Sequence, residues 1–332
     1  MLRAAPAFQP DPPDHGGGID AAAARFGGMR SDWLDLSTGI NPIPYPIPHL
    51  PPDAWTALPD QTATAALDHA ARRFWKVPDT AAVLAAPGAS SLIARIPTLA
   101  PAGRVHIPRP TYNEHARAFL AQGWTVTDAA PDTAPDTAAE AVVLVHPNNP
   151  DGRLASASDA TPRLTIIDES FCDVLPDASL MRLASRPGTL ILKSFGKFWG
   201  LAGLRLGFAI GDPGLTAHLA RLLGPWPVSG PALAIGTHAL SNPDWSAATR
   251  RRLAADTRQL DALMKGHGLT PLGGTSLFRL YDTPDAAHLQ TALARHRIWT
   301  RTFPYNPRWL RLGLPGASAQ WDRLASALKS PG

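Results

Sequence analysis

Two lysines near the middle of the chain differ in whether their position suits a catalytic role. The segment TLILKSFGKFWG places Lys193 inside an apolar run typical of a strand, and Lys197 in the loop that follows it. Ligands of open parallel sheets bind beyond the carboxyl ends of the strands, which favours Lys197. Lys193 could be an ordinary solvated charge on its strand. We therefore expect Lys197 to be the functional lysine.

A carboxylate also stands at a strand end. Asp168 follows the apolar run LTII, and Glu169 comes directly after it. A buried carboxylate is costly unless a cation or a hydrogen-bond donor meets it. A protonated pyridine nitrogen would be such a partner, so Asp168 and Lys197 together suit a pyridoxal cofactor.

Two loops and one short motif add polar groups to the same edge. Residues 87–91, PGASS, form a glycine-containing turn whose N–H groups and hydroxyls could cradle a phosphate, although small residues also cap helices routinely. Residues 146–152, HPNNPDG, fix an amide between two prolines, where an ordinary turn is the alternative. Ser194 and Lys197 have the S-x-x-K spacing of serine acylases. The companion S-D-N, K-T-G and G-x-S-x-G motifs are missing, which makes an acylase a poor interpretation.

The elements that must position these residues form an α/β pattern. Helices are expected over residues 63–75 and 114–123. Short apolar strands are expected in the segments AVLAAPG, RVHIPRP, AVVLVHP, LTIIDES and TLILKSF. Strands that look buried on both faces and alternate with helices predict a mainly parallel sheet covered by helices.

A second region begins after the run GPWPVSGP, which ends at residue 231. A long helical stretch follows, and then the apparent strands TSLFRLY and WLRLGLP, which suit a smaller α+β domain. We predict an N-terminal arm over residues 1–52 that adds to the small domain and the active site. A large cofactor-binding domain over residues 53–230 follows, and then a linking helix with the small domain over residues 231–332.

Composition excludes several other classes of protein. The chain has 332 residues, 45% of them hydrophobic, and a net charge of +4 with positive and negative residues interleaved, so we expect no nucleic-acid partner. The start lacks the apolar core of a signal peptide and no stretch could span a bilayer, so we expect no membrane partner and a cytoplasmic location. Cys172 is the single cysteine, and no residue group has metal-site spacing, so we expect no metal.

Taken in order, the motifs resemble the fold-type I pyridoxal-phosphate enzymes of the aminotransferase superfamily. The resemblance extends almost from end to end and is closest to the branch that contains histidinol-phosphate aminotransferase and threonine-phosphate decarboxylase. The matching segments are HGGG (15–18), STGINP (37–42), PGASSLI (87–93), PTY (110–112), HPNNPDG (146–152), IDESFCD (167–173), SFGKFWGLAGLRLG (194–207) and WLRLGLPG (309–316).

Within that branch, STGINP, GPWPVSGPALAIG and GGTSLFRL are similar to the decarboxylases of the aerobic cobalamin pathway. The resemblance implies decarboxylation of a phosphorylated amino acid, L-threonine O-3-phosphate, to (R)-1-amino-2-propanol O-2-phosphate. A histidinol-phosphate aminotransferase is the alternative, and a homodimer is implied in either case. Intact Lys197 and Asp168 argue against a non-catalytic binding protein that kept the fold.

The resemblance implies a role for each matching residue. Lys197 would form the Schiff base and return a proton to Cα, Asp168 would keep the pyridine nitrogen protonated, and Tyr112 would stack on the ring. The residues implied to bind the cofactor are Gly88, Ala89, Ser90, Tyr112, Asn149, Asp168, Ser194, Lys197 and Arg205. Those implied to bind the substrate are Arg311 for its carboxylate, Arg301 and His15 for its phosphate, and Asn41.

Some of these residues have ordinary alternatives when each is taken alone. Tyr112 could be a core aromatic, Arg205 part of a surface ion pair and Arg311 an edge-strand charge. Two positions depart from the family pattern. Phe171 stands where many aminotransferases have a tyrosine that touches the ring oxygen, and Leu58 where relatives often have a tyrosine that reaches the neighbouring subunit's cofactor phosphate. We expect Phe171 to alter the pKa of the Schiff base and to disfavour transamination.

Overall fold

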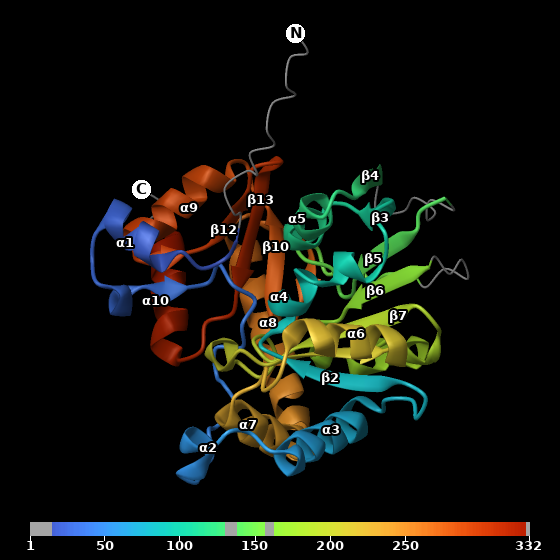
Figure 1. The fold of residues 1–332 in the computed structure, drawn as a ribbon. Coiled ribbons are helices and arrows are strands. Elements are labelled where there is room, and N and C mark those ends of the chain that lie inside the picture. Colours follow the sequence, from blue (N-terminus) through green and yellow to red (C-terminus); the bar gives the residue numbers. More distant parts are fainter. Residues whose placement is uncertain (1–14, 130–137, 157–162, 330–332) are drawn as a thin grey trace.

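A seven-stranded sheet forms the larger part of the fold (Figure 1). The structure, a computed structural model, describes residues 15–129, 138–156 and 163–329. Only β8 runs antiparallel to its neighbours, which confirms the predicted mainly parallel sheet. In spatial order the strands are β2 (Ala82–Ala86), β8 (Gly207–Gly211), β7 (Thr189–Ser194), β6 (Leu164–Asp168), β5 (Ala141–Val145), β3 (Arg104–Pro108) and β4 (Thr125–Ala129).

Helices cover both faces of this sheet because alternate strand residues point to opposite sides. Ile166 and Leu190 belong to one buried hydrophobic cluster, whereas their chain neighbours Ile167 and Ile191 belong to another. The cluster with Ile166 packs against α4 (Ala89–Ile93), α5 (Asn113–Ala121) and α6 (Pro213–Leu223). The cluster with Ile167 packs against α3 (Gln61–Trp75), α7 (Gly230–Leu240) and α8 (Pro243–Gly266).

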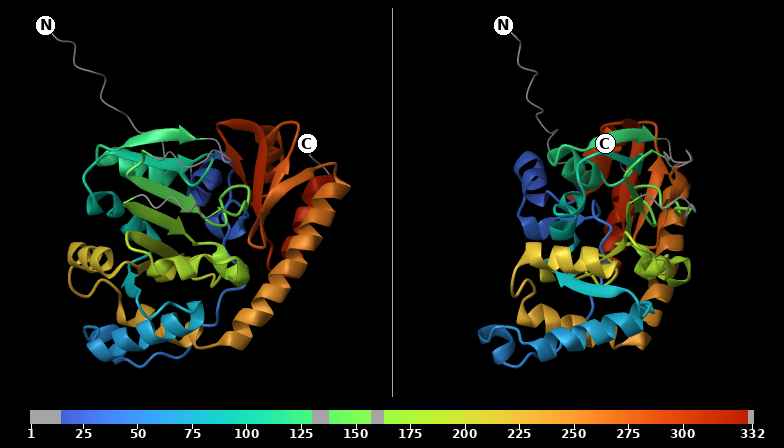
Figure 2. Two further views of the ribbon diagram at one scale, coloured as in Figure 1. Left: turned by 90° about the vertical axis from the view of Figure 1, so that its right-hand side faces the viewer. Right: turned by 45° about the vertical axis from the view of Figure 1, so that its right-hand side comes forward.

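A second, antiparallel sheet stands beside the first. Its strand order is β12 (Arg301–Phe303), β13 (Asn306–Gly313), β10 (Phe278–Asp282) and β9 (Thr270–Thr275). The helices α9 (Ala286–Arg295) and α10 (Ser318–Lys329) complete this second unit, as Figure 1 shows. The 24-residue helix α8 runs along the outside of the molecule and leads the chain into this sheet (Figure 2, left).

The predicted long helical stretch after residue 231 is in fact two helices. α7 ends at Leu240, and the side chain of Asn242 accepts a hydrogen bond from Trp245 N to begin α8, which has Pro243 at its first position. Because α7 packs against α3, the element that links the two sheets is α8. Within the ranges that the structure describes, no helix has both the length and the apolar character needed to cross a bilayer.

The N-terminal segment is attached to the second unit. β1 (Leu34–Asp35) pairs in parallel with β11 (Ile298–Trp299), and α1 (Ile19–Phe26) lies against α9. The remaining elements are short. They are α2 (Asp53–Thr56) and the 3-10 helices η1 (Arg30–Asp32), η2 (Ile96–Leu99), η3 (Cys172–Val174), η4 (Pro176–Ala178), η5 (Met181–Ser185) and η6 (Ala202–Leu204).

Candidate active site

Asp168 is the last residue of β6 and is only 2% exposed. His115 Nε2 lies 2.8 Å from Asp168 Oδ2, and Ser170 N donates to Asp168 Oδ1 at 2.9 Å. Burial alone would raise the pKa of this carboxyl, but the hydrogen bonds and the charge of His115, together with Ser170, lower it. Asp168 is therefore held as a carboxylate, and its oxygens can accept a further hydrogen bond from a cationic ring nitrogen.

The first turn of α5 contributes to the site through several successive residues. Tyr112 caps the helix, and its ring centroid lies 6.1 Å from that of His115. Burial, followed by the charges of Asp168 and Glu114, raises the pKa of Tyr112 to about 12, so its hydroxyl stays protonated. His115 was missed in the sequence. Its only signal is a histidine in the first turn of the helix that follows a strand end.

Lys197 lies in the loop after β7, as expected, and is partly buried. Burial and the charge of Arg311 lower the pKa of its amine to about 8, and Arg301 and Arg205 act in the same direction. A lower pKa makes the neutral, nucleophilic amine far more available near neutral pH. Lys197 Nζ also lies 5.4 Å from the centre of the Phe171 ring. Phe171 therefore stands beside the reactive amine without offering it a hydroxyl.

The turn before α4 forms a cradle with Arg205. Gly88 has φ +82°, and a Cβ there would lie 2.5 Å from Arg205 Nη2. Arg205 Nη2 donates to Ser90 Oγ at 3.0 Å, so its guanidinium lies against the turn. On the other side, a Cβ on Gly207 would lie 2.4 Å from Ala89 N. Small residues thus let the guanidinium and the N–H groups of the turn converge where a phosphate can bind.

Ser194 completes the β7 end of this region. Its Oγ accepts a hydrogen bond from Gly196 N at 3.3 Å, and so fixes the turn that leads to Lys197. A pyridoxal-phosphate cofactor fits this set of residues on chemical grounds. The set combines an amine of lowered pKa, a carboxylate at the neighbouring strand end and a glycine-lined phosphate cradle.

Arg311 is buried on β13 and points toward the large sheet. Its Nη1 donates to Asn149 Oδ1, and its Nη2 donates to Ser37 O at 2.6 Å. Arg301 lies directly opposite Arg311 in the β12–β13 pair, and residues opposite one another in such a pair share a face. The charges of both arginines lower the pKa of Lys197, so both lie near its amine. Arg311 is only 2% exposed, which excludes a solvated edge-strand charge.

His15 is the first described residue and lies at the mouth of the site. Its Nε2 is 3.2 Å from Glu114 Oε1, and its ring centroid is 6.0 Å from that of Tyr112. The segment that follows is fixed to the second unit, because Gly17 N donates to Ser37 Oγ at 2.6 Å. The roles of Ser37 and Glu114 were not found in the sequence.

Asn41 makes its contacts within the protein. Its Nδ2 donates to Phe198 O at 2.9 Å, and its Oδ1 accepts from Arg252 Nη2 at 2.7 Å. Asn41 N also donates to Lys197 O at 3.0 Å. The side chain thus fixes the loop that contains Lys197, and its contact with substrate stays a prediction.

Lys193 is not the solvated charge that its strand position allowed. It is 1% exposed, and its Nζ lies 2.6 Å from Glu169 Oε2 and 3.3 Å from Asp173 Oδ1. Burial alone would lower the pKa of this amine, but the two carboxylates raise it well above the ordinary value. Lys193 is therefore a permanently charged member of a buried ionic cluster behind the site.

One buried group on the same side has metal-ligating residue types. Donor atoms of His146, Glu169 and Cys172 lie within 4.8 Å of one another. The imidazole is already engaged on both nitrogens, since Ala155 N donates to His146 Nδ1 at 3.0 Å and His146 Nε2 lies 2.8 Å from Ala178 O. We assign this group a structural role in holding the loops behind the sheet.

Comparisons with known proteins agree with this geometry. The sequence matches the family "Aminotransferase class I and II" over residues 49–328. A threonine-phosphate decarboxylase of Sinorhizobium sp. is 44% identical, with 95% of this chain and 97% of that protein covered. The corresponding protein of Pseudomonas aeruginosa is 39% identical over the same shares of the two chains.

Solved structures show the same fold. The histidinol-phosphate aminotransferase of Sinorhizobium meliloti in complex with pyridoxal 5'-phosphate aligns with a TM-score of 0.79 at 20% identity, covering 99% of this chain and 98% of that one. The L-threonine-O-3-phosphate decarboxylase of Porphyromonas gingivalis aligns with a TM-score of 0.71 at 19% identity, covering 89% and 98%. The fold-type I architecture is thereby confirmed.

Proposed function

The chain belongs to the class I and II aminotransferase family, and on that premise we propose that it is a pyridoxal-phosphate-dependent decarboxylase of L-threonine O-3-phosphate. The product is (R)-1-amino-2-propanol O-2-phosphate, an intermediate of cobalamin biosynthesis. Relatives that are 44% and 39% identical over 95% of the chain are named threonine-phosphate decarboxylase, which supports this activity above the alternatives. The proposal includes a cytoplasmic location.

The cofactor and the protein have separate roles in the proposed reaction. Pyridoxal phosphate, when bound, supplies an aldehyde that joins the substrate amine and a protonated ring that accepts the electron pair left at Cα. Lys197 would hold the cofactor and Asp168 would keep a proton on its ring nitrogen, with His115 fixing the carboxylate. Asn149 would hold the ring hydroxyl. Gly88, Ala89, Ser90, Ser194 and Arg205 would bind the cofactor phosphate.

Lys197 also acts on the substrate. Lys197 Nζ would supply the proton that Cα takes up in place of the carboxylate once CO2 has left. Tyr112 would pack against the cofactor ring and restrain it. The residues that bind the substrate would set its orientation, and that orientation would select decarboxylation over transamination.

The observation that supports this substrate most directly is the pairing of Arg301 and Arg311. L-Threonine O-3-phosphate has a carboxylate and a phosphate, and arginines at two facing strand positions can bind the two anions separately. Arg311 binds the carboxylate, and Arg301 with His15 binds the phosphate. Replacing Arg301 with Leu should then raise the KM for the phosphorylated substrate while leaving cofactor affinity unchanged. Equal weakening of both ligands would reject this role.

The experiment that tests the activity compares two substrates. The purified enzyme is incubated with L-threonine O-3-phosphate and CO2 is measured, and in parallel with histidinol phosphate plus 2-oxoglutarate and glutamate is measured. CO2 release without glutamate is the expected result. Glutamate formation without CO2 would favour the aminotransferase alternative, and protein that develops no yellow colour with pyridoxal phosphate would favour a non-catalytic protein.

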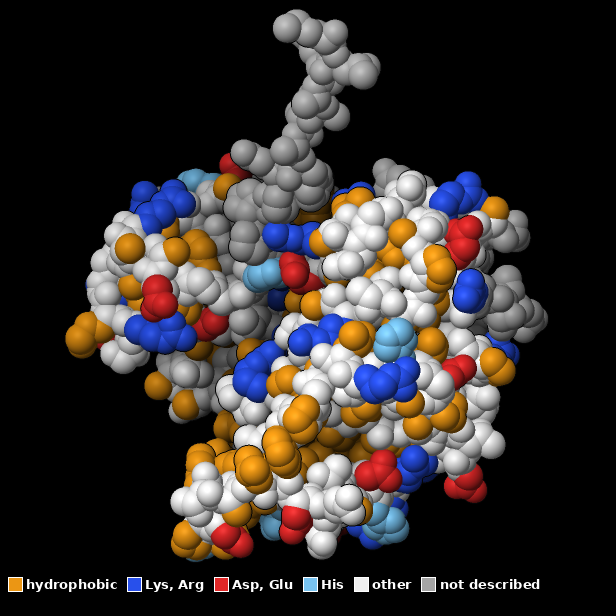
Figure 3. All heavy atoms as spheres, viewed as in Figure 1, with side chains coloured by type: hydrophobic (Ala, Val, Ile, Leu, Met, Phe, Trp, Pro, Cys, Tyr) orange, Lys and Arg blue, Asp and Glu red, His pale blue; other side chains and the backbone are white. Residues whose placement is uncertain are grey.

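We also propose that the enzyme is a homodimer. Trp55, Leu58 and Trp226 are 57–69% exposed near α2 and the start of α7, and Figure 3 shows hydrophobic side chains gathered over that part of the surface. Exposed aromatic patches of this kind commonly mark interfaces. Sedimentation should give twice the mass of the chain, and Trp55→Glu should shift the protein toward the monomer. A monomeric wild type would contradict the proposal.

A further inference from the structure

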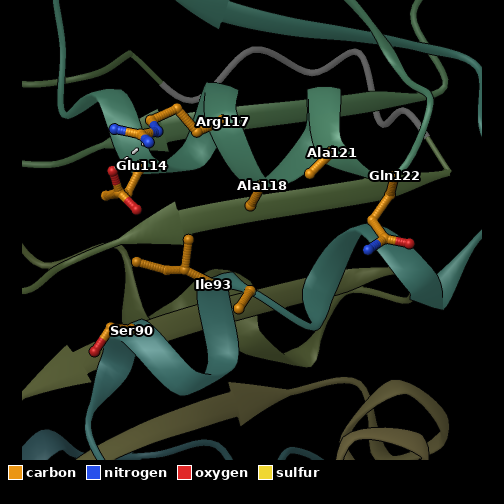
Figure 4. A pocket seen from close by; sticks show the side chains of 8 residues that line it. Ser90, Ile93, Glu114, Arg117, Ala118, Ala121 and Gln122 are labelled. Carbon is orange, nitrogen blue, oxygen red and sulfur yellow. Dashed lines mark ion pairs between the residues drawn. The ribbon is translucent and has the colours of Figure 1, made fainter. Parts of the chain in front are cut away.

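Glu114 is the residue through which α5 contacts the N-terminal arm. Its Oε1 lies 3.2 Å from His15 Nε2 and 3.6 Å from Arg117 Nε, one turn further along the helix. Figure 4 shows Glu114 and Arg117 turned toward each other on α5, with Ser90 on α4 across the groove. The side chains of His15, Glu114 and Arg117 are each about one-third exposed. A carboxylate between two basic groups is thus held at one defined place on the helix.

The backbone next to His15 is fixed independently of its side chain. A Cβ on Gly16 would lie 2.4 Å from Ser37 O, so the arm approaches Ser37 more closely than a larger residue allows. Trp299 Nε1 donates to Gly17 O at 2.9 Å and anchors the next residue. With the main chain fixed, the direction of the His15 imidazole depends on the group that its ring nitrogen contacts, and that group is Glu114.

The contact between His15 and Glu114 lies beside the reacting groups. The same helical turn contains Tyr112, whose ring is 6.0 Å from the His15 ring, and His115, which binds Asp168. The charge of Glu114 raises the pKa of Tyr112 and that of Arg301 lowers it, so both groups are close to the phenol. Glu114 therefore stands at the side of the site where the substrate's phosphate has to enter.

A carboxylate near an anion site would repel the substrate unless cations stand between them. Glu114 lines an open groove of about 450 Å3 between α4 and α5 that also includes Ser90, a residue of the phosphate cradle. Arg117 lies beside its oxygen and offsets its charge, and His15 contacts the same oxygen. A carboxylate at this position cannot bind an anion itself, but it can orient a histidine that binds one.

We propose that Glu114 is a positioning residue that directs the His15 imidazole toward the phosphate of the substrate, with Arg117 restraining Glu114. This inference rests on the proposed substrate and on the role of His15 in binding it. It predicts that Glu114 affects phosphate recognition through His15 alone and leaves the chemistry at Cα and the cofactor unchanged.

The test is a double-mutant cycle. Glu114→Ala, Glu114→Gln, His15→Ala and the double variant His15→Ala/Glu114→Ala are compared in KM and kcat for L-threonine O-3-phosphate. The same proteins are titrated with this ligand through the change in cofactor absorbance, which gives a Kd without turnover. Asp68→Ala is the matched control, because Asp68 forms a helix-surface ion pair of similar exposure with Arg72, far from the site.

Glu114→Ala should raise KM and Kd about three- to fivefold, the range expected for one partly exposed charged contact, with kcat and the cofactor spectrum unchanged. Glu114→Gln should restore most of this loss, because a side chain of the same length can still contact the His15 ring. In the His15→Ala background, Glu114→Ala should change nothing. The control should match the wild type.

Three results would overturn the inference. They are an unchanged KM in Glu114→Ala, an equal rise in KM when His15 is already absent, or an equal loss of activity toward unphosphorylated L-threonine. A wild type that binds L-threonine O-3-phosphate but releases no CO2 would overturn the proposed activity alone, because the Kd values still test Glu114. A wild type that does not bind it would overturn both.

Discussion

The two central lysines can be distinguished by making the same substitution at each. Lys193→Met removes the cation that contacts both Glu169, at 2.6 Å, and Asp173, at 3.3 Å. The two carboxylates stay buried and lose this cation, while neutral donors such as Trp199 Nε1 and Leu180 N remain. Lys197→Met removes an amine whose charge is already disfavoured by burial, so the fold should tolerate it.

The expected loss of stability in Lys193→Met follows from the burial of the cluster. Removing one partner of a buried ion pair costs about 3–5 kcal/mol. Unfolding entropy is about 2.1 cal/mol/K per residue, or about 0.7 kcal/mol/K for this chain, so a loss of about 4 kcal/mol lowers Tm by about 6 °C. Lys197→Met should change the Tm of the cofactor-free protein by no more than about 1 °C.

The assay measures stability and covalent attachment separately. Thermal unfolding is followed by circular dichroism after the cofactor has been removed, so that cofactor binding does not contribute to Tm. Attachment is measured by borohydride reduction with pyridoxal phosphate, followed by peptide mapping. We expect Lys193→Met to lose stability but to keep the label on the peptide with Lys197, and Lys197→Met to keep stability but to lose the label.

Two outcomes would refute this reasoning. A Tm for Lys193→Met within 1 °C of the wild type would show that the buried cluster does not depend on its cation. A label that disappears in Lys193→Met and persists in Lys197→Met would show that the roles of the two lysines are reversed.

Three further predictions concern the site itself. Because the pKa of Lys197 is lowered to about 8, its amine loses its proton at a lower pH than an ordinary lysine does. The rate at which pyridoxal phosphate attaches to the cofactor-free protein should therefore rise with pH through about 8. A midpoint near 10.5 would contradict this prediction. Gly88→Ala should weaken cofactor affinity at least about tenfold, because the new Cβ would meet Arg205 and the residue would also be strained at positive φ. Gly123→Ala is the control, since Gly123 has a similar φ but lies in open space. Equal cofactor affinities of the two variants in a fluorescence titration would reject the phosphate cradle. Phe171→Tyr should shift the pH titration of the bound cofactor's absorbance, because the new hydroxyl lies near Lys197; an unchanged titration would remove the explanation for the missing tyrosine.

Local sequence patterns were sufficient for most of the fold. The apolar runs before Asp168 and around Lys193 are buried on both faces, which is why they are recognisable as strands without any alternation. β4 and β8 were not predicted. β4 has the polar sequence TVTDA at the sheet edge, and β8 has the glycine-bounded sequence GFAIG, so neither shows a clear strand pattern. Their pairing is decided by neighbouring strands.

The site was predictable where one residue type at a strand end identifies its role. Asp168 and Lys197 are of this kind. His115 and Glu114 could not be assigned, because their roles depend on how α5 packs across β6 and against the arm, which no local pattern specifies. Lys193 was misjudged for the same reason, since its partners come from another part of the chain and meet it only in the folded core.

The pairing of β1 with β11 has a mechanical consequence. The arm is joined to the second unit by the pairing of Leu34–Asp35 with β11, at Gly17 through Trp299, and at Ser37 through Arg311. Arg311 and the segment that follows His15 therefore belong to the second unit, while Lys197 and Asp168 belong to the first. If the second unit rotated against the first, it would turn a substrate bound by Arg311 relative to a cofactor bound by Lys197. Which substrate bond is broken would then depend on the angle between the two sheets.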